Sequence, residues 1–261
     1  MGYVTYATGY KGPGFNNTTS VAGVSSLGVA PETVGAFEIG LKESLFDNRM
    51  NLNISLFDQN FKDLQVQTFS PTTTSFITQN SATARAQGLE MQVVGKVTPK
   101  LRLSAGVTLL SAKFGDFAGA QCYVGQLGCA TNGTFNAAGI TLPNAPTQTA
   151  TVQAEYKTAF TDSVRVTYEA NLYYRSEVNF SANGDPGMQL PSATTLGASV
   201  SFETNDGKWR ASLFCRNCTD ERVPTSLSPD AVQANFGNRA YTQQWGYSSF
   251  RSLGASVDYR F

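Results

Sequence analysis

Few residues in this sequence are of types that do chemistry, and one reactive type never occurs. None of the 261 residues is histidine, which excludes an imidazole base, a histidine-ligated metal and a Ser-His-Asp triad. The carboxylates are scattered, with no recognisable pair for acid–base catalysis. Lys plus Arg and Asp plus Glu number 19 each, whereas a nucleic-acid partner requires a basic surface. We therefore predict no enzymatic activity, no cofactor, no metal and no nucleic-acid partner.

The four cysteines form two closely spaced pairs. Cys122 and Cys129 enclose a polar, glycine-rich stretch, which favours a disulfide within a loop over a metal site with only two thiols. Cys215 and Cys218 have the spacing of a redox motif, but such chemistry requires the motif to open a helix. Here the motif closes an alternating segment. We expect Cys215 and Cys218 to be small apolar fillers, with or without a local disulfide.

The segment 229–245 is the best candidate for binding a small molecule. It combines aromatic rings, amides and one guanidinium, a mixture that suits a chelate or a sugar. The predicted contact residues there are Phe236, Arg239, Tyr241, Gln243, Gln244 and Trp245, with Tyr10 and Lys11 as weaker candidates near another long connection. The alternative is that these side chains line or pack inside the interior of the protein.

The elements that would position these residues are strands, because the apolar residues alternate with a period of two. Val164, Val166 and Tyr168 alternate with Arg165 and Thr167, and the pattern continues to residue 175. The same alternation recurs at 1–8, 37–41, 52–56, 89–93, 101–109, 152–156, 196–202, 209–213 and 253–261. The sequence predicts about ten strands, several of them longer than the usual 5–6 residues.

The predicted connections alternate strictly between long and short. The long ones are 10–32, 68–83, 115–146, 180–191 and 218–248, and the short ones, rich in turn residues, are 46–49, 98–100, 159–162 and 204–207. In an up-and-down antiparallel meander this order places every tight turn at one end and every long loop at the other. A soluble sandwich has no reason for that asymmetry, whereas outer-membrane barrels have it.

The fold class predicted from these patterns is all-β, an antiparallel up-and-down transmembrane β-barrel. Charged residues make up 15% of the chain, below the usual ~25%, as expected when one strand face meets lipid and the other a hydrated lumen. We expect aromatic girdles at the membrane interfaces, formed by Tyr156, Tyr168, Tyr174, Trp209, Tyr259 and Phe261.

Five short motifs resemble the C-terminal part of the barrel of TonB-dependent outer-membrane receptors. They occur in the order found in that family, at 9–16, 31–42, 80–90, 217–222 and 255–261. The last is similar to the terminal-strand signal that the barrel-assembly machinery binds, with Val257, Tyr259 and Phe261 as its apolar positions. Cys218 departs from the pattern, since the family usually has an aliphatic residue there.

The resemblance implies an outer-membrane receptor of a Gram-negative bacterium that takes up a scarce ligand such as an iron–siderophore complex, energised by the TonB complex. Ten strands fall short of the about 22 of such barrels, and the family's plug domain has no counterpart in these residues. The start of the chain lacks the basic region and apolar core of a signal peptide. We therefore expect residues 1–261 to be one partial barrel domain, partnered by outer-membrane lipid, by the barrel-assembly machinery, by TonB through the plug, and by the ligand.

Two alternatives remain open from the sequence. One is a complete small barrel that acts as a passive pore, since ten strands suffice geometrically for a closed barrel. The other is a soluble all-β adhesin or lectin, which shares the alternation of apolar and polar residues.

Overall fold

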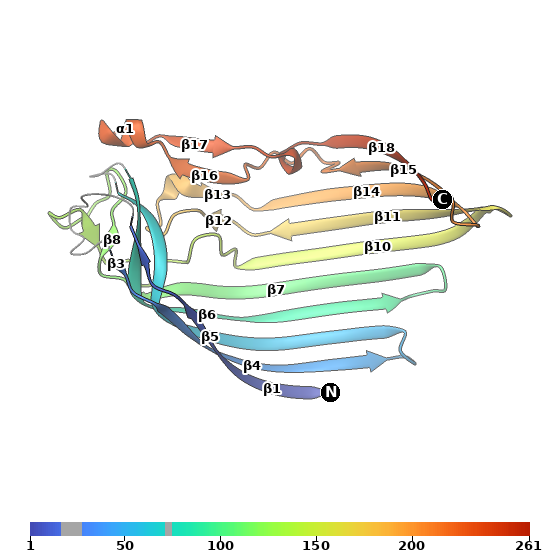
Figure 1. Ribbon diagram of the computed structural model, residues 1–261, viewed down its shortest axis with the longest axis horizontal. Coiled ribbons are helices and arrows are strands. Elements are labelled where there is room, and N and C mark those ends of the chain that lie inside the picture. Colours follow the sequence, from blue (N-terminus) through green and yellow to red (C-terminus); the bar gives the residue numbers. More distant parts are fainter. Residues whose placement is uncertain (17–27, 71–74) are drawn as a thin grey trace.

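The main body of the protein is a single antiparallel sheet of ten strands, seen side-on in Figure 1. The structure, a computed structural model, describes residues 1–16, 28–70 and 75–261. Each long strand pairs with the next long strand along the chain, as an up-and-down meander requires. The ten strands are β1 (Gly2–Lys11), β4 (Glu32–Leu45), β5 (Met50–Ser70), β6 (Ser75–Lys96), β7 (Leu101–Asp116), β10 (Gln148–Thr161), β11 (Val164–Arg175), β14 (Ala193–Thr204), β15 (Trp209–Arg216) and β18 (Ser252–Tyr259).

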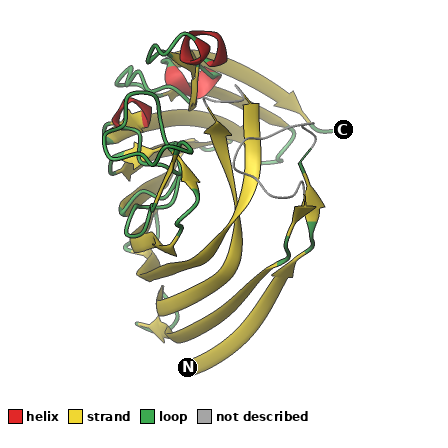
Figure 2. Ribbon diagram, turned by 90° about the vertical axis from the view of Figure 1, so that its left-hand side faces the viewer, coloured by secondary structure: helices red, strands yellow, loops and turns green. Residues whose placement is uncertain are grey.

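The ten-stranded antiparallel arrangement confirms the predicted fold class. Figure 2 shows that the strands form a curved wall. In the described part of the chain the edge strands β1 and β18 do not pair with each other, so the wall is not closed into a barrel. No helix within the described ranges is long and apolar enough to cross a membrane.

The small elements all belong to the long connections. They are β2 (Gly14–Phe15), β3 (Gly28–Val29), β8 (Ala120–Gln121), β9 (Thr134–Phe135), β12 (Val178–Asn179), η1 (Pro186–Met188), β13 (Gln189–Leu190), β16 (Ser226–Pro229), α1 (Ala231–Asn235), β17 (Tyr241–Gln244) and η2 (Tyr247–Ser249). The tight turns lie at one end of the sheet and the long connections at the other (Figure 1). The predicted asymmetry of the connections is confirmed.

One predicted loop is wrong. Residues 68–83 were expected to form a long connection, but β5 extends to Ser70 and β6 begins at Ser75. The strands continue because their backbones stay paired from Leu64↔Ser81 onward and because Val66 and Ile77 are buried. Asp63 has a positive φ of 54°, and the register of the two strands is the same on both sides of it. β4 pairs with β5 up to Lys62 and β7 pairs with β6 up to Thr83, so the described part of this hairpin extends beyond its two neighbours.

The two faces of the sheet differ in chemistry, as the alternation predicts. The outward face carries exposed apolar side chains such as Leu56, Val152 and Leu253. The other parity carries polar groups that meet one another across strands, for example Tyr3 with Glu38 and Ser199 with Glu169. We call these the outward face and the inward face. Exposed apolar surface of this extent marks a face that contacts a membrane or another protein surface.

Close backbone approach explains a glycine in one of the motifs. A Cβ atom added at Gly88 on β6 would lie 2.3 Å from the carbonyl oxygen of Leu109 and 2.8 Å from the ring of Phe57. Phe57 faces Gly88 directly on the neighbouring strand, so the ring covers the backbone where the side chain is missing. Phe214 covers Gly254 of the edge strand β18 in the same way. Such aromatic cover stabilises glycines in sheets.

Aromatic side chains gather on the outward face near the tight turns. The ring centroids of Trp209 and Tyr259 lie 4.6 Å apart, and those of Tyr156 and Tyr168 lie 6.4 Å apart on paired strands. These four residues form the girdle expected at that interface. Tyr174, by contrast, lies at the opposite end of β11.

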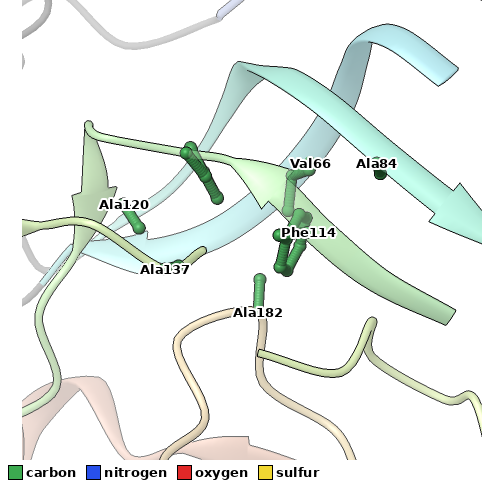
Figure 3. Packing of buried hydrophobic residues seen from close by; sticks show 7 residues of the cluster. Val66, Ala84, Phe114, Ala120, Ala137 and Ala182 are labelled. Carbon is green, nitrogen blue, oxygen red and sulfur yellow. The ribbon is translucent and has the colours of Figure 1, made fainter. Parts of the chain in front are cut away.

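The buried core lies under the long loops and not within the wall. Phe114 is almost fully buried and packs with Val66 and Ala84 of the neighbouring strands against loop residues that include Ala137 and Ala182. Figure 3 shows Ala182 directed at Phe114. Residues from the connections 117–147 and 176–192 therefore pack onto the inward face at one end of the sheet. This packing gives the loops a defined conformation.

Candidate ligand-binding site

The predicted binding segment folds into an ordered hairpin. Strands β16 and β17 pair from Ser226↔Gln244 to Pro229↔Tyr241, and α1 lies between them. The Asp230 carboxylate caps this short helix by accepting hydrogen bonds from the amides of Val232 and Gln233, at 3.0 and 3.1 Å. The hairpin holds Arg239 and Tyr241 in fixed positions.

Arg239 and Tyr241 both contact a carboxylate of another loop. Arg239 Nη2 donates to Asp185 Oδ1 at 2.7 Å, and the Tyr241 hydroxyl lies 2.9 and 3.0 Å from the two Asp185 oxygens. Arg239 Nε also donates to the Tyr241 hydroxyl at 3.2 Å. Asp185 is buried, and its carboxylate accepts a further bond from the amide of Gly187 at 2.9 Å. These donors compensate the cost of burying the Asp185 carboxylate.

A third loop contacts Arg239 through Tyr123. The Arg239 guanidinium lies over the Tyr123 ring, 5.2 Å from its centroid, in a cation–π contact. Together with the β5–β6 hairpin, the three loops line a cavity of about 90 Å³, whose walls include these polar groups and apolar side chains such as Met188 and Leu227. That volume holds a few water molecules. The cavity is therefore a small space where the loops meet, and it is too small for a large ligand.

The local electrostatics follow from these contacts. Hydrogen bonds to Tyr241 and Asp185 raise the pKa of the Arg239 guanidinium. Burial raises the pKa of the Tyr241 phenol, and its bond to Asp185 acts in the same direction. The guanidinium is therefore charged and the phenol neutral at any physiological pH. Sequence reasoning missed Asp185, because its partners lie more than 50 residues away in the sequence and no local pattern marks it.

The remaining predicted contact residues of this hairpin are exposed to solvent. Phe236 follows α1 and is 72% exposed. Gln243 and Gln244 are exposed on β17, and Gln244 accepts a hydrogen bond from the Ser226 hydroxyl at 3.2 Å. Trp245 packs on Phe250, with ring centroids 5.6 Å apart. Aromatic and amide side chains of the hairpin are thus accessible to solvent.

The two weaker candidates lie elsewhere. Tyr10 and Lys11 end β1, and β1 and β18 are the opposite edges of the sheet. Tyr10 shares the parity of the outward residues Val4 and Tyr6, whereas Lys11 has the inward parity. The structure therefore does not bring these two residues together with the 229–245 hairpin.

Both cysteine pairs are disulfide-bonded in the structure. The Cys122–Cys129 bond closes a small loop in the connection that also carries Tyr123. The tip of this loop is exposed, with Leu127 96% accessible. The Cys215–Cys218 bond joins the end of β15 to the first residues of the last long connection.

Comparison with known proteins identifies the family. Residues 1–218 match the family model described as "TonB dependent receptor-like, beta-barrel". The chain belongs to the TonB-dependent receptor family. It is also 30% identical, over 159 residues, to the probable TonB-dependent siderophore receptor PiuA of Acinetobacter baumannii, an overlap of 59% of this chain and 20% of PiuA.

Solved structures agree with this fold. The crystal structure of the ferric yersiniabactin uptake receptor FyuA from Yersinia pestis matches with a TM-score of 0.73 at 16% identity, over 100% of this chain and 35% of FyuA. The structure of PiuA from A. baumannii matches with a TM-score of 0.70 at 22% identity, over 99% of this chain and 33% of PiuA. The chain thus spans about a third of the solved receptors that it matches.

Family membership locates this TonB-dependent receptor chain in the outer membrane of a Gram-negative bacterium. The soluble adhesin or lectin alternative is therefore wrong. The long connections correspond to external loops and the tight turns to periplasmic turns. Val257 and Tyr259, two of the three predicted assembly residues, lie on the edge strand β18, and Phe261 follows it with its ring 5.1 Å from that of Tyr259.

The motif at 217–222 has a structural role that the sequence did not reveal. The Asn217 side chain donates to the carbonyls of Glu221 and Ser248, at 2.9 and 3.2 Å. The Asp220 carboxylate accepts from the amide of Arg251 at 3.0 Å. These bonds clasp the two ends of the last external loop together. The Arg251 amide and the Arg222 guanidinium hold the pKa of Asp220 below its usual value. A positive φ of 46° at Asn217 suits asparagine.

Proposed function

We propose that this chain supplies part of the wall and several external loops of a receptor for TonB-energised uptake of an iron–siderophore complex. The names of its relatives support the ligand class: PiuA is a probable siderophore receptor and FyuA a ferric yersiniabactin uptake receptor. Because the sequence match covers about a fifth of PiuA, the activity of the whole receptor is part of this proposal. We further propose that the chain has a transport role and no enzymatic one.

The observation that carries this proposal is the ordered loop layer at the external end. Connections 117–147, 176–192 and 217–251 contact one another through Tyr123, Asp185 and Arg239. A layer ordered in this way presents a ligand surface without a large entropic cost of binding. Phe236, Gln243, Gln244 and Trp245 form that surface in our proposal, with Arg239 and Tyr241 beneath them. Tyr10 and Lys11 would form a separate, weaker contact at the far edge.

The whole chain would form one barrel portion. The family model ends at residue 218, but β18 pairs with β15 along its whole length, from Trp209↔Tyr259 to Arg216↔Ser252. Residues 1–261 therefore act as one partial domain. Val257, Tyr259 and Phe261 would engage the barrel-assembly machinery, and a plug domain would connect the receptor to TonB.

The test is a loop exchange in the full-length receptor. Residues 229–245 are replaced by a Gly/Ser segment of equal length, and binding of a panel of ferric siderophores to the purified receptor is measured. We expect at least a tenfold loss of affinity for the cognate complex, with unchanged heat-modifiable gel mobility. The matched control is Val232→Ala, which removes an exposed apolar side chain of the same hairpin. Equal affinity in the exchanged and native receptors would contradict the proposed site.

A further inference from the structure

The basic residues of the outward face gather in one place. Among the described residues of the ten long strands, Lys62, Arg85 and Lys113 are the Lys and Arg residues with outward parity, and they belong to the consecutive strands β5, β6 and β7. The other strand cations have inward parity, for example Lys42, which lies over the ring of Tyr3. We call Lys62, Arg85 and Lys113 the outward cationic patch. All three side chains are exposed.

The sheet register brings these three residues close together. Arg85 faces Lys113 directly across β6 and β7, and directly opposite residues have Cβ atoms about 4.5–5.5 Å apart. Lys62 faces Thr83, two residues from Arg85, which is a diagonal separation of about 7–8 Å. Like charges directly opposite each other, as Arg85 and Lys113 are, destabilise a sheet, so an anion bound here would stabilise the arrangement.

The described residues of the chain compensate only part of this charge. Asp58 forms a two-point ion pair with Arg85, with Nε–Oδ1 at 2.9 Å and Nη2–Oδ2 at 2.5 Å. Within the same described ranges, neither Lys62 nor Lys113 forms a salt bridge, although Asp63 and Asp116 lie close by in the sequence. Two ammonium groups therefore remain free beside a guanidinium whose charge is already paired.

The height of the patch on the wall points to the kind of anion. Asn60, which faces Arg85, lies ten residues past Met50 at the tight-turn end of β5. At about 3.3 Å per residue and a strand tilt of about 40°, that distance spans roughly 25 Å across the membrane. The apolar band of an outer-membrane barrel is about 25 Å tall. Leu56, Leu89 and Leu109 occupy adjoining positions of the outward face on the periplasmic side of the patch. The patch thus lies at the outer limit of the lipid-facing band.

We propose that the outward cationic patch binds the phosphorylated head group of an outer-leaflet lipid. The acyl chains lie along the leucines, and the phosphate bridges Lys62 and Lys113 and takes the remaining guanidinium donors of Arg85. Lysine near a membrane surface attracts anionic lipid. Asp58 keeps the Arg85 guanidinium at the centre of the site. The proposal rests on the family's membrane location and does not depend on the proposed transport function.

The test measures lipid binding to the full-length receptor in detergent by native mass spectrometry. The probe is lipid A carrying both phosphates, compared with the same lipid after removal of both. We expect the phosphorylated form to bind at least tenfold more tightly, and Lys62→Gln with Lys113→Gln to abolish that preference. Replacing both residues with arginine keeps the charges and retains the preference. Lys42→Gln with Lys96→Gln removes two inward cations as the matched control and leaves binding unchanged.

Several outcomes would overturn the proposal. Equal binding of the two lipid forms would show that phosphate is not recognised. The double glutamine variant is first shown to be folded by its heat-modifiable mobility. If it keeps the preference for the phosphorylated lipid, Lys62 and Lys113 do not contact the phosphate. Displacement of the lipid by an equal concentration of inorganic phosphate would indicate a simple anion site. Loss of binding in the inward control would indicate a general effect of charge.

Discussion

Arg239 and Asp185 are 54 residues apart in the sequence, and their side chains meet with Nη2 2.7 Å from Oδ1. The contact joins two external loops at a buried carboxylate, and the Tyr241 hydroxyl completes it. In this position Arg239 stabilises the loop layer through its contact with Asp185. Arg239, which the sequence predicts to contact a ligand, therefore also holds two loops together. We call the contact of Arg239 and Tyr241 with Asp185 the brace.

The first prediction concerns this brace. Asp185→Asn removes the charge that holds Arg239 and Tyr241, so opening of the 217–251 loop should become easier by roughly 1–3 kcal/mol, the usual cost of leaving such groups poorly paired. Hydrogen–deuterium exchange of that loop should accelerate accordingly. Asp206→Asn, at a periplasmic turn, is the control and should leave the exchange unchanged. Identical exchange in Asp185→Asn and the native protein would contradict the role of the brace.

The second prediction concerns pH. The Asp220 carboxyl has a pKa held below its ordinary value, first by the Arg251 amide and then by Arg222. A lowered folded-state pKa stabilises the fold above the unfolded value of about 3.9 and is lost as the pH falls through the lower folded value. The clasp of the last loop should therefore be constant from about pH 7 to 5 and weaken below about pH 4.

Trp245 fluorescence can report this transition in a Trp209→Phe background, which leaves a single tryptophan. Asp220→Asn should flatten the acid-induced change, because the amide does not titrate in this range. The same acid midpoint with and without Asp220 would rule out the clasp as its origin.

The third prediction concerns the Cys122–Cys129 disulfide. Closing so short a loop reduces the conformational freedom of the unfolded chain, which stabilises the folded state by about 2–3 kcal/mol. This loop lies outside the ten-stranded wall. Cys122→Ser with Cys129→Ser should loosen the connection 117–147, measured as faster proteolysis there, without a change in heat-modifiable mobility. Mass spectrometry with and without reductant should show the bond directly in the native protein, and free thiols at both positions would refute it.

The fourth prediction concerns the backbone packing at Gly88. Gly88→Ala should destabilise the barrel by about 1–3 kcal/mol, as overpacking does, because the added Cβ meets the Leu109 carbonyl and the Phe57 ring. Gly12→Ala is the matched control, since a Cβ there has no neighbour within 4 Å. The temperature at which the folded gel band disappears should fall for Gly88→Ala only. Equal temperatures for the two variants would show that the strands can move apart.

Much of the wall could be predicted from the sequence because its information is local. The period-two alternation around Val166 and Tyr168 determines which face of β11 meets lipid, and the alternation of long and short connections determines the order of the strands. The five short motifs, among them the one that contains Gly88 and the one at the terminal strand, indicated the family. The prediction of a long connection at 68–83 was wrong because the pairing between β5 and β6 continues past Asp63 and outweighs the polar, turn-like composition of that segment.

The tertiary structure decided the contacts between residues far apart in the chain. No local pattern marks Asp185 as the partner of Arg239, because that pairing depends on how three loops pack over Phe114. The outward cationic patch exists only because the register places Arg85 opposite Lys113 and beside Lys62. A one-residue shift of register would turn those side chains inward. The sequence by itself determined the strands, their faces and the family, while the packing of loops and the register determined which charges meet.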